Sequence, residues 1–345
     1  MIGRTNAKAI SGSDPSIPVG IGQHLVTFYD FDGKVLKRQR VATGGNATAP
    51  DTPIHQHLTF AEWNNPFTNV QSDIDTGAIY NTTDGKTYLF ITLTPVTGLA
   101  PTLYFYKSSN SLMTIDWGDG TTSTSTTSGN QTIQHTYASA GDYIITVDNS
   151  QGGLYRFGHG TYPITSFYGN QGILTMIFLG ANLTTAAANQ FTASTSLMYV
   201  STGSYLTSYG NNSFQSTRIK HINVNSLNVS AEFYEWNNAM KIVDNVRRTN
   251  LIYFYKNIGL RGKLIFPSVT FIPANCFFQN INVEAYIFLS PTPPTLVNIN
   301  AFGGINPICK IYVPDASVAA YKAATNWVNY SAYIYPLSEK PQSDE

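Results

Sequence analysis

Charged residues are scarce in this chain of 345 residues. Asp, Glu, Lys and Arg together make up 12% of it, roughly half of the share that is usual in soluble domains. Twenty basic residues offset twenty acidic ones, so the formal net charge is zero. Proteins that bind nucleic acid carry a surplus of positive charge that meets the phosphates. The composition therefore predicts no nucleic-acid partner.

Cysteines and long apolar runs are also rare. Cys276 and Cys309 are the two cysteines, and their spacing fits neither a disulfide framework nor a metal site. We expect both to be buried free thiols, because unpaired cysteine behaves as a small apolar side chain. No run approaches the roughly 18 apolar residues of a membrane-spanning helix. The basic start of the chain leads into no apolar segment of a secretory signal, so we expect neither a membrane span nor that export route.

Motifs of the common enzyme classes are missing as well. No glycine-rich phosphate loop precedes a helical pattern, and neither G-x-S-x-G nor H-E-x-x-H occurs. Glu232 and Glu235 are close in sequence, but a glycosidase needs two opposed carboxylates, and the alternative is a solvated turn. His159 and His221 are isolated, and we expect both to be structural. The sequence thus predicts no enzyme activity, no catalytic residue and no cofactor.

Ser, Thr, Asn and aromatic residues are abundant instead, with 22 tyrosines among them, and this composition is typical of a β-rich surface. The clearest pattern covers residues 114–147. Alternating apolar runs at 113–117 and 143–147 predict half-buried strands. The first run ends at Gly118-Asp119-Gly120, where glycine permits positive φ and Asp bonds its own backbone. A short polar and aromatic segment, residues 135–137, is expected to start another strand.

Three motifs in this stretch, WGDGT at 117–121, HTY at 135–137 and GDYIITV at 141–147, resemble the PKD domain. That family is a small immunoglobulin-like β-sandwich, and the resemblance implies a spacer or adhesion module. Asp116 and Asp119 are then turn residues, with a surface Ca²⁺ as the alternative. The resemblance implies that five residues of the motifs are structural: Trp117, Asp119, His135, Tyr137 and Tyr143.

Residues 24–82 form a second pattern. Two strand-like runs, 25–29 and 35–41, flank a turn that ends in Asp32-Gly33, a strong hairpin signal. The order VTFYDFDGKVLKRQRV, TAPDTP and LTFAEWN resembles the internalin-type repeat, a small β-grasp module of bacterial surface proteins. His55 and His57 would alternate on one strand face, as a metal site or an exposed polar edge. No third ligand stands beside them, so we predict no metal.

Residues 150–313 show self-similarity at a fixed period. Leu174 and Leu197 are 23 residues apart, as are Phe191 and Phe214. Periods of 20–29 residues are typical of leucine-rich repeats, in which each unit buries its apolar edge against its neighbours. The phrase LIFPSVTFIPANCF resembles the repeats of bacteroidal surface antigens. We expect about six repeats, with a degenerate stretch at residues 241–261.

The C-terminal segment resembles the capping segment of the same repeat class, on the phrases KIYVPDASVAAYKAATNW and YIYPL. A last strand at 311–313 precedes a helix at 317–324, and residues 334–336 close the segment. Val318 and Tyr321, three residues apart, are expected to face inward. The sequence therefore predicts a helical cap, which a solenoid needs because its last repeat otherwise exposes core.

Aromatic residues on the repeats are candidate platforms for sugars, because a ring face suits the flat apolar face of a sugar. The alternative is that these rings lie in the core of the repeats. The candidate ligand surface consists of Tyr199, Tyr205, Tyr209, Tyr234, Trp236, Tyr253 and Tyr255.

The expected fold is mainly β and multidomain. Its segments are an extended arm at 1–23, a β-grasp module at 24–82, an immunoglobulin-like β-sandwich at 83–149, a leucine-rich-repeat solenoid at 150–313, and a C-terminal helical cap with a tail at 314–345. The arm has no amphipathic period and no core of its own, so we expect it to dock on a partner.

Modules of these kinds usually belong outside cells, yet the chain carries no export signal. A bacteriophage virion protein resolves the conflict, since it assembles in the cytoplasm and ends outside. We therefore expect a non-enzymatic virion-surface protein, such as a head fibre, tail fibre, decoration protein or adhesin. It would be homo-oligomeric or multicopy, bind other virion proteins through residues 1–23, and contact host-surface glycans or proteins. The alternative is a bacterial cell-surface adhesin of the leucine-rich-repeat type.

Overall fold

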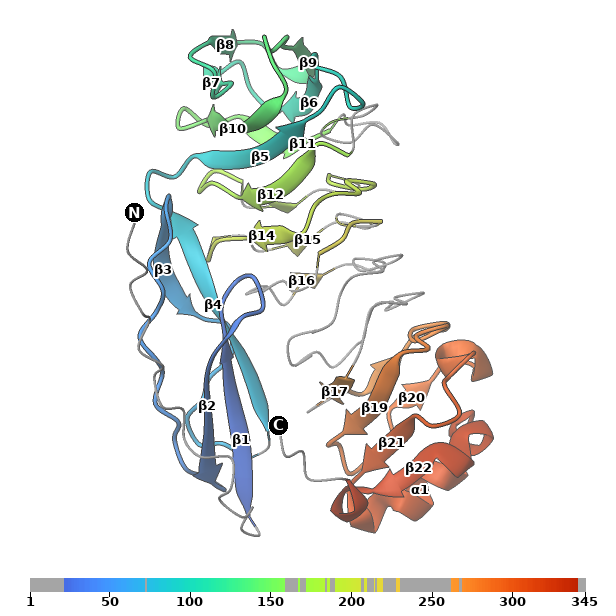
Figure 1. Cartoon of the computed structure of the whole chain (residues 1–345). Coiled ribbons are helices and arrows are strands. Elements are labelled where there is room, and N and C mark those ends of the chain that lie inside the picture. Colours follow the sequence, from blue (N-terminus) through green and yellow to red (C-terminus); the bar gives the residue numbers. More distant parts are fainter. Residues whose placement is uncertain are drawn as a thin grey trace, which may run out of the picture.

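The fold is mainly β and contains several sheets (Figure 1), which confirms the expected class. The computed structural model describes residues 22–71, 73–158, 167, 172–183, 185–186, 190–205, 208–209, 214, 216–219, 228–229, 262–266 and 269–340. Within this part of the chain, no helix has the length and apolar character needed to cross a membrane. Almost all of the expected arm, and the degenerate stretch at 241–261, lie outside the described residues.

The first sheet has the strand order β2-β1-β4-β3. Its strands are β1 (Gln23–Tyr29), β2 (Val35–Ala42), β3 (Leu58–Trp63) and β4 (Ile74–Thr82). The arm expected at 1–23 is thus one residue too long, because Gln23 already pairs with Ala42. Gly33 has a φ of +85° and closes the expected β1–β2 hairpin. Strands β1 and β4 run parallel at the centre of this sheet.

A six-stranded and a three-stranded sheet follow, in the orders β14-β12-β5-β10-β7-β8 and β11-β6-β9. The strands of the larger sheet are β5 (Thr87–Leu93), β7 (Met113–Asp116), β8 (Thr122–Ser125), β10 (Gly141–Asp148), β12 (Leu174–Phe178) and β14 (Tyr199–Ser201). Those of the smaller sheet are β6 (Thr102–Lys107), β9 (Gly129–Gln134) and β11 (Leu154–Phe157). Alternate side chains of both sheets, such as Phe105 and Ile145, meet in one fully buried core.

Strand pairing continues across the expected boundary between residues 149 and 150. Strand β12 pairs antiparallel with β5, with Leu174 opposite Ile91, and β11 pairs with β6. Gly180 adds a close backbone contact, since a Cβ at this position would lie 2.4 Å from the Gly85 carbonyl oxygen. A single buried cluster extends from Leu89 to Ile334. Residues on both sides of the expected boundary therefore share one core.

Parallel strands recur along the second half of the chain (Figure 1). They are β13 (Thr185–Ala186), β15 (Ser208–Tyr209), β16 (Asn228–Val229), β17 (Gly262–Phe266), β18 (Phe271–Ile272), β19 (Val283–Phe288), β20 (Thr295–Leu296), β21 (Lys310–Val313) and β22 (Ile334–Pro336). Aromatic residues from segments that follow one another in this half of the chain stack together. Phe191 and Phe214 lie 5.5 Å apart at 17°, and Phe266 and Phe288 lie 4.9 Å apart at 18°. Buried rings thus continue from one unit to the next.

Short helices fill the C-terminal end, where a single helix was expected at 317–324. They are η1 (Ile299–Phe302), η2 (Asp315–Ser317), α1 (Val318–Ala323), η3 (Trp327–Tyr333) and η4 (Leu337–Glu339). Tyr321 is fully buried as expected, and Val318 packs partly buried against the same core. Ala324 ends α1 with an extended backbone, and Asn326 then adopts positive φ.

Side chains of this C-terminal segment bond to the backbone of the preceding unit. The Tyr321 hydroxyl donates to the carbonyl of Ser290 at 2.9 Å, and the Trp327 indole N–H donates to that of Pro294 at 2.8 Å. Asn326 Nδ2 donates to the Leu296 carbonyl at 2.7 Å. These bonds satisfy buried or half-buried backbone carbonyls.

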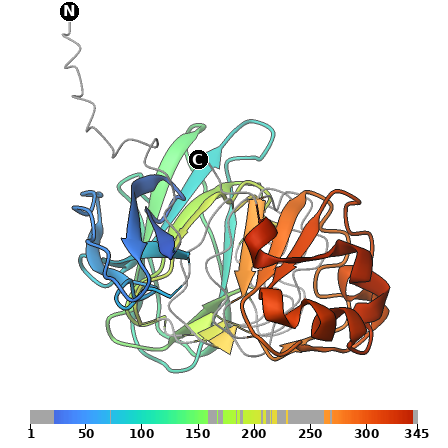
Figure 2. The same ribbon diagram turned by 90° about the horizontal axis from the view of Figure 1, so that it is seen from below.

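The first sheet packs against the rest of the molecule at two places. Phe31, in the turn after β1, contacts both Tyr80 of β4 and Phe178 of β12 in a shared aromatic cluster. Asn81 accepts a hydrogen bond from the backbone N–H of Ser204 at 2.8 Å. At the far end, Lys340 forms an ion pair with Asp73 at 3.1 Å. Figure 2 shows the blue N-terminal strands and the red C-terminal helices on opposite sides of the view.

Both cysteines are buried and form no disulfide bond, as expected. Burial raises the pKa of Cys309 to about 12. We therefore predict that neither thiol of the native protein reacts with Ellman's reagent at pH 8, whereas both react after unfolding in guanidinium chloride. Absorbance of the released chromophore gives the count in each case. Rapid reaction of a thiol in the native protein would contradict this burial.

Candidate functional site

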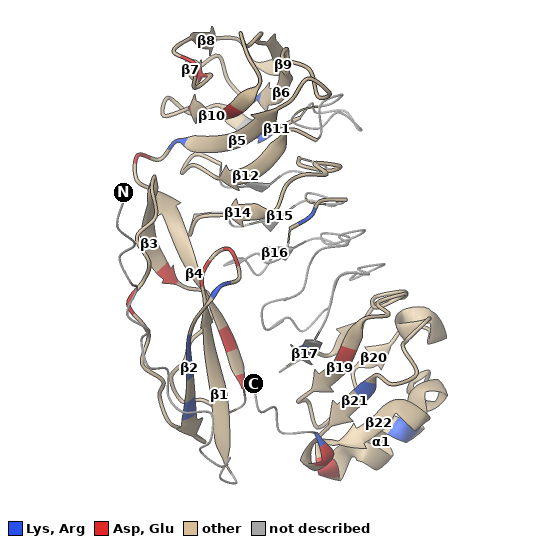
Figure 3. Ribbon diagram, viewed as in Figure 1, with Lys and Arg blue, Asp and Glu red and all other residues tan. Residues whose placement is uncertain are grey.

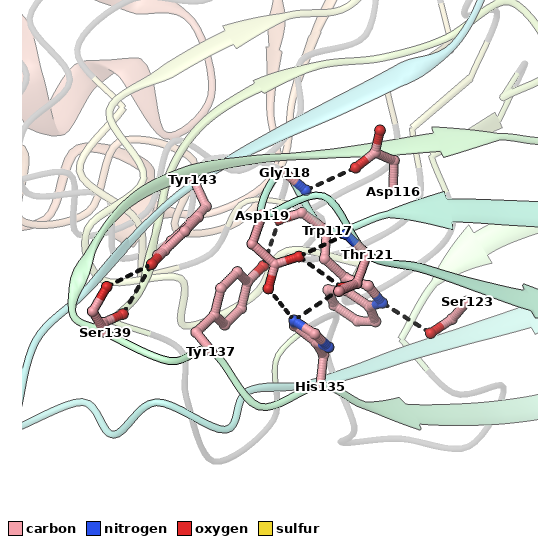
Figure 4. A network of polar contacts seen from close by, with 10 residues as sticks. All are labelled: Asp116, Trp117, Gly118, Asp119, Thr121, Ser123, His135, Tyr137, Ser139 and Tyr143. Carbon is pink, nitrogen blue, oxygen red and sulfur yellow. Dashed lines mark hydrogen bonds and ion pairs between the residues drawn. The ribbon is translucent and has the colours of Figure 1, made fainter.

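The motif residues around Trp117 form a polar network at the end of β7 (Figure 4). The Trp117 indole is fully buried, and its Nε1 donates to the Ser123 hydroxyl at 2.9 Å. The Tyr137 hydroxyl donates to the Trp117 carbonyl at 2.9 Å, and the Tyr143 hydroxyl donates to that of Ser139 at 3.0 Å. These hydrogen bonds, around the buried Trp117 and Tyr137 side chains, join neighbouring turns and strand ends, which supports a structural role for the network.

Asp119 and His135 complete the network. The His135 Nε2 lies 2.7 Å from Asp119 Oδ2, and its ring stacks on Trp117 at 4.7 Å and 15°. The other carboxylate oxygen of Asp119 accepts hydrogen bonds from the hydroxyl and N–H of Thr121. Residues 135–137 were expected to start a strand, but β9 ends at Gln134 and they follow it. They leave the strand because the His135 and Tyr137 side chains bond to the turn at Trp117 and Asp119.

Bonds from Thr121 and His135 lower the pKa of Asp119 from its ordinary 3.8 to about 2. The folded state therefore favours the ionised carboxylate, and the stability gained is full above about pH 4 and lost as the pH falls toward 2. We predict that Asp119→Asn flattens this part of the pH profile of the melting temperature. Asp51→Asn, in an exposed loop, controls for the loss of one charge. Parallel profiles for wild type and Asp119→Asn between pH 4 and 2 would contradict the prediction.

Asp116 closes the preceding turn, with Oδ1 accepting the N–H of Gly118 at 2.9 Å. Gly118 has a φ of +76°, and a Cβ there would lie 2.6 Å from the Ile144 carbonyl oxygen. The two aspartates are thus engaged in turn hydrogen bonds, as the turn interpretation predicts. Among the described residues, no three His, Cys, Asp or Glu side chains lie close enough together to hold a metal ion.

His55 and His57 do not lie on a strand, so the expected exposed polar edge is wrong. His57 has a φ of 65° and stacks on Tyr88 at 4.4 Å. His55 Nε2 pairs at 3.0 Å with the buried carboxylate of Asp30, and its ring meets Phe31 edge-on at 5.0 Å. Burying a carboxylate is costly without a partner. The loop before β3 therefore folds back and supplies one.

The candidate ligand surface is described only in part. Tyr199 lies half-buried in β14 and packs against the aromatic cluster that includes Phe178. Tyr205 is half-buried too, and its hydroxyl donates to the Leu179 carbonyl at 2.7 Å. Burial raises the pKa of Tyr205. Tyr209 lies in β15. The remaining candidates, Tyr234, Trp236, Tyr253 and Tyr255, lie outside the described residues. So do Glu232, Glu235, His159 and His221.

A further feature appears on the face of the six-stranded sheet that points away from its core and packs in part against the first sheet. Ile144, Phe90, Met176 and Tyr199 lie directly opposite one another on four neighbouring strands, β10, β5, β12 and β14. We call these four half-buried residues the apolar row. Strands β5, β12 and β14 contain no Lys, Arg, Asp or Glu (Figure 3). Period-2 alternation in residues 87–93 indicates that Phe90 faces away from the core. The same alternation does not predict which strands lie beside β5.

Comparison of the chain with models of known protein families gives no match. Comparison with curated protein sequences gives no significant match either.

Proposed function

We propose that this chain is a non-enzymatic structural and adhesion protein on the surface of a bacteriophage virion, of the head-fibre, tail-fibre or decoration type. The residues that precede β1 anchor it to other virion proteins, and the folded modules project outward in several copies. The observation that supports this best is the shared core that extends from Leu89 to Ile334. Modules joined by one core hold a fixed shape, which suits a projecting surface protein.

The proposal includes a finer reading of the fold. The packed sheets around Trp117 support a PKD-like β-sandwich, and the mixed sheet of β1–β4 is proposed to be the internalin-type module. Parallel pairing of Met176 with Tyr199, 23 residues later, supports a leucine-rich-repeat solenoid. The bonds from Tyr321 and Trp327 to the preceding unit support a terminal cap, which keeps the last repeat from exposing core.

Immunogold electron microscopy tests the proposed location. Antibodies raised against the recombinant chain should label purified particles of the phage whose genome encodes it, at regular positions on the head or tail. Uninfected host cells serve as the control and should stay unlabelled. Unlabelled particles together with labelled surfaces of uninfected bacteria would replace the virion proposal with the cell-surface adhesin.

The anchoring role of the arm gives a separate prediction. Deleting residues 1–21 leaves Gln23 and the whole of β1 in place, so the truncated protein should keep its melting temperature. It should be missing from particles assembled in cells that supply only this form, because the segment left out has no core of its own. Band intensities on gels of purified particles measure the occupancy. Normal occupancy of the truncated form would place the anchor elsewhere in the chain.

A further inference from the structure

The apolar row is straight and spans four neighbouring strands. Ile144 pairs with Phe90, Phe90 with Met176, and Met176 with Tyr199. Neighbouring strands lie 4.7–4.9 Å apart, so the row extends over about 14 Å. It begins on β10, a strand of the sheet around Trp117, and ends on β14, in the region of the parallel strands. Its regular spacing matches a ligand that is itself a linear repeat.

Aromatic and polar groups border the row on different sides. Phe60 and Trp63 of β3 belong to the same aromatic cluster and are also half-buried. Two residue pairs further along β5 and β10, on the same face, the Thr92 hydroxyl donates to Asp142 Oδ1 at 2.7 Å. The row thus combines ring faces and apolar side chains with a margin that can bond to hydroxyl groups.

The lack of basic residues around the row favours a neutral ligand over an anionic one. Because β5, β12 and β14 contain no Lys or Arg, no cation from these strands would neutralise an anionic polymer that covered the row. Burying an unpaired charge is costly, whereas apolar sugar faces stack well on aromatic rings. Binding sites also occur preferentially where structural units meet, and here the first sheet meets the larger one through Phe31, Tyr80 and Phe178.

We propose that the apolar row, with Phe60 and Trp63 beside it, binds a linear neutral glycan along this face of the six-stranded sheet. This inference rests on the proposed adhesion function and assigns it a site. Phe90 and Tyr199 stack on sugar rings of the chain on either side of Met176, and Asp142 accepts hydrogen bonds from sugar hydroxyls. Of the tyrosines considered from sequence, Tyr199 is the member that belongs to this site.

Affinity electrophoresis of the full chain tests the site. Native gels are cast with a neutral β-1,4-linked polysaccharide, either hydroxyethyl cellulose or galactomannan, or with anionic alginate. Wild type should be retarded by at least one neutral polymer, and alginate should not retard it. The double variant Phe90→Thr/Tyr199→Thr keeps strand-forming residues and should bind roughly tenfold more weakly, since two ring contacts are lost. Tyr104→Thr, on the other sheet, is the matched control and should bind like wild type.

A conservative variant separates binding from folding. Tyr199→Phe retains the ring and should retain binding, while melting temperatures and near-ultraviolet circular dichroism report whether each variant is folded. If the folded double variant is retarded as strongly as wild type, the proposed location of the site is wrong. Retardation by alginate alone, or by none of the polymers, would overturn the neutral-glycan assignment. Immunogold labelling decides the virion location independently, so the two failures can be told apart.

Discussion

Replacing Trp117 by alanine is expected to lower the free energy of unfolding by about 3–5 kcal/mol, the usual cost of removing a large aromatic side chain from a core. The indole is fully buried, stacks on His135 and donates to Ser123. Alanine leaves a cavity and removes the partner of that hydroxyl. Urea unfolding followed by near-ultraviolet circular dichroism measures the loss.

Trp117→Phe is the matched variant, because it keeps an aromatic ring but removes the indole N–H. It should cost less than alanine, since much of the packing against His135 remains. An unfolding midpoint of Trp117→Ala equal to that of wild type would show that the ring is not buried, and would remove the main support for a sandwich.

Trp327→Ala is expected to have an effect of similar size, about 3–5 kcal/mol, at the other end of the molecule. Its ring is fully buried between Phe288 and Phe302, with centroids 5.4 and 5.6 Å away, and its N–H bonds to the Pro294 carbonyl. Loss of the ring exposes the last parallel strands. The amide hydrogens of β19 and β21 should therefore exchange faster in the variant than in wild type, whereas those of β5 and β10 should change less.

Val328 provides the control for this prediction. It follows Trp327 directly but is 54% exposed, so Val328→Ala should change stability by less than about 0.5 kcal/mol. Equal exchange rates of β19 in wild type and Trp327→Ala would mean that the C-terminal helices do not protect the last strands.

Local sequence patterns predicted many of the strands well. The alternating run at 143–147 lies within β10, and the hairpin at Asp32-Gly33 was expected from the turn residues alone. These features depend on neighbours in the chain, where period and turn chemistry carry the signal. The helix expected at 317–324 is longer than α1, which ends where Ala324 adopts an extended backbone. That end depends on tertiary packing, which the local sequence does not indicate.

Long-range pairing could not be predicted in the same way. Nothing near Leu174 indicates that β12 continues the sheet of β5, some eighty residues earlier. The pair of His55 with Asp30 likewise depends on a loop that folds back over the first hairpin. The apolar row was missed for this reason, since its members become neighbours only through the register of four strands. Of the candidate site, sequence supplied Tyr199 but not its surroundings.

The ion pair of Lys340 with Asp73 determines where a fused protein or an inserted epitope would lie on the molecule. Asp73 also accepts the N–H of Leu25, so the start of β1 and the end of the described chain meet at one pole. The turn between β8 and β9, residues 126–128, lies at the opposite pole (Figure 1). A fluorescent protein fused after the C-terminus would therefore sit close to the base of the molecule. A peptide epitope inserted into that exposed turn would be presented outermost, where antibodies reach it first.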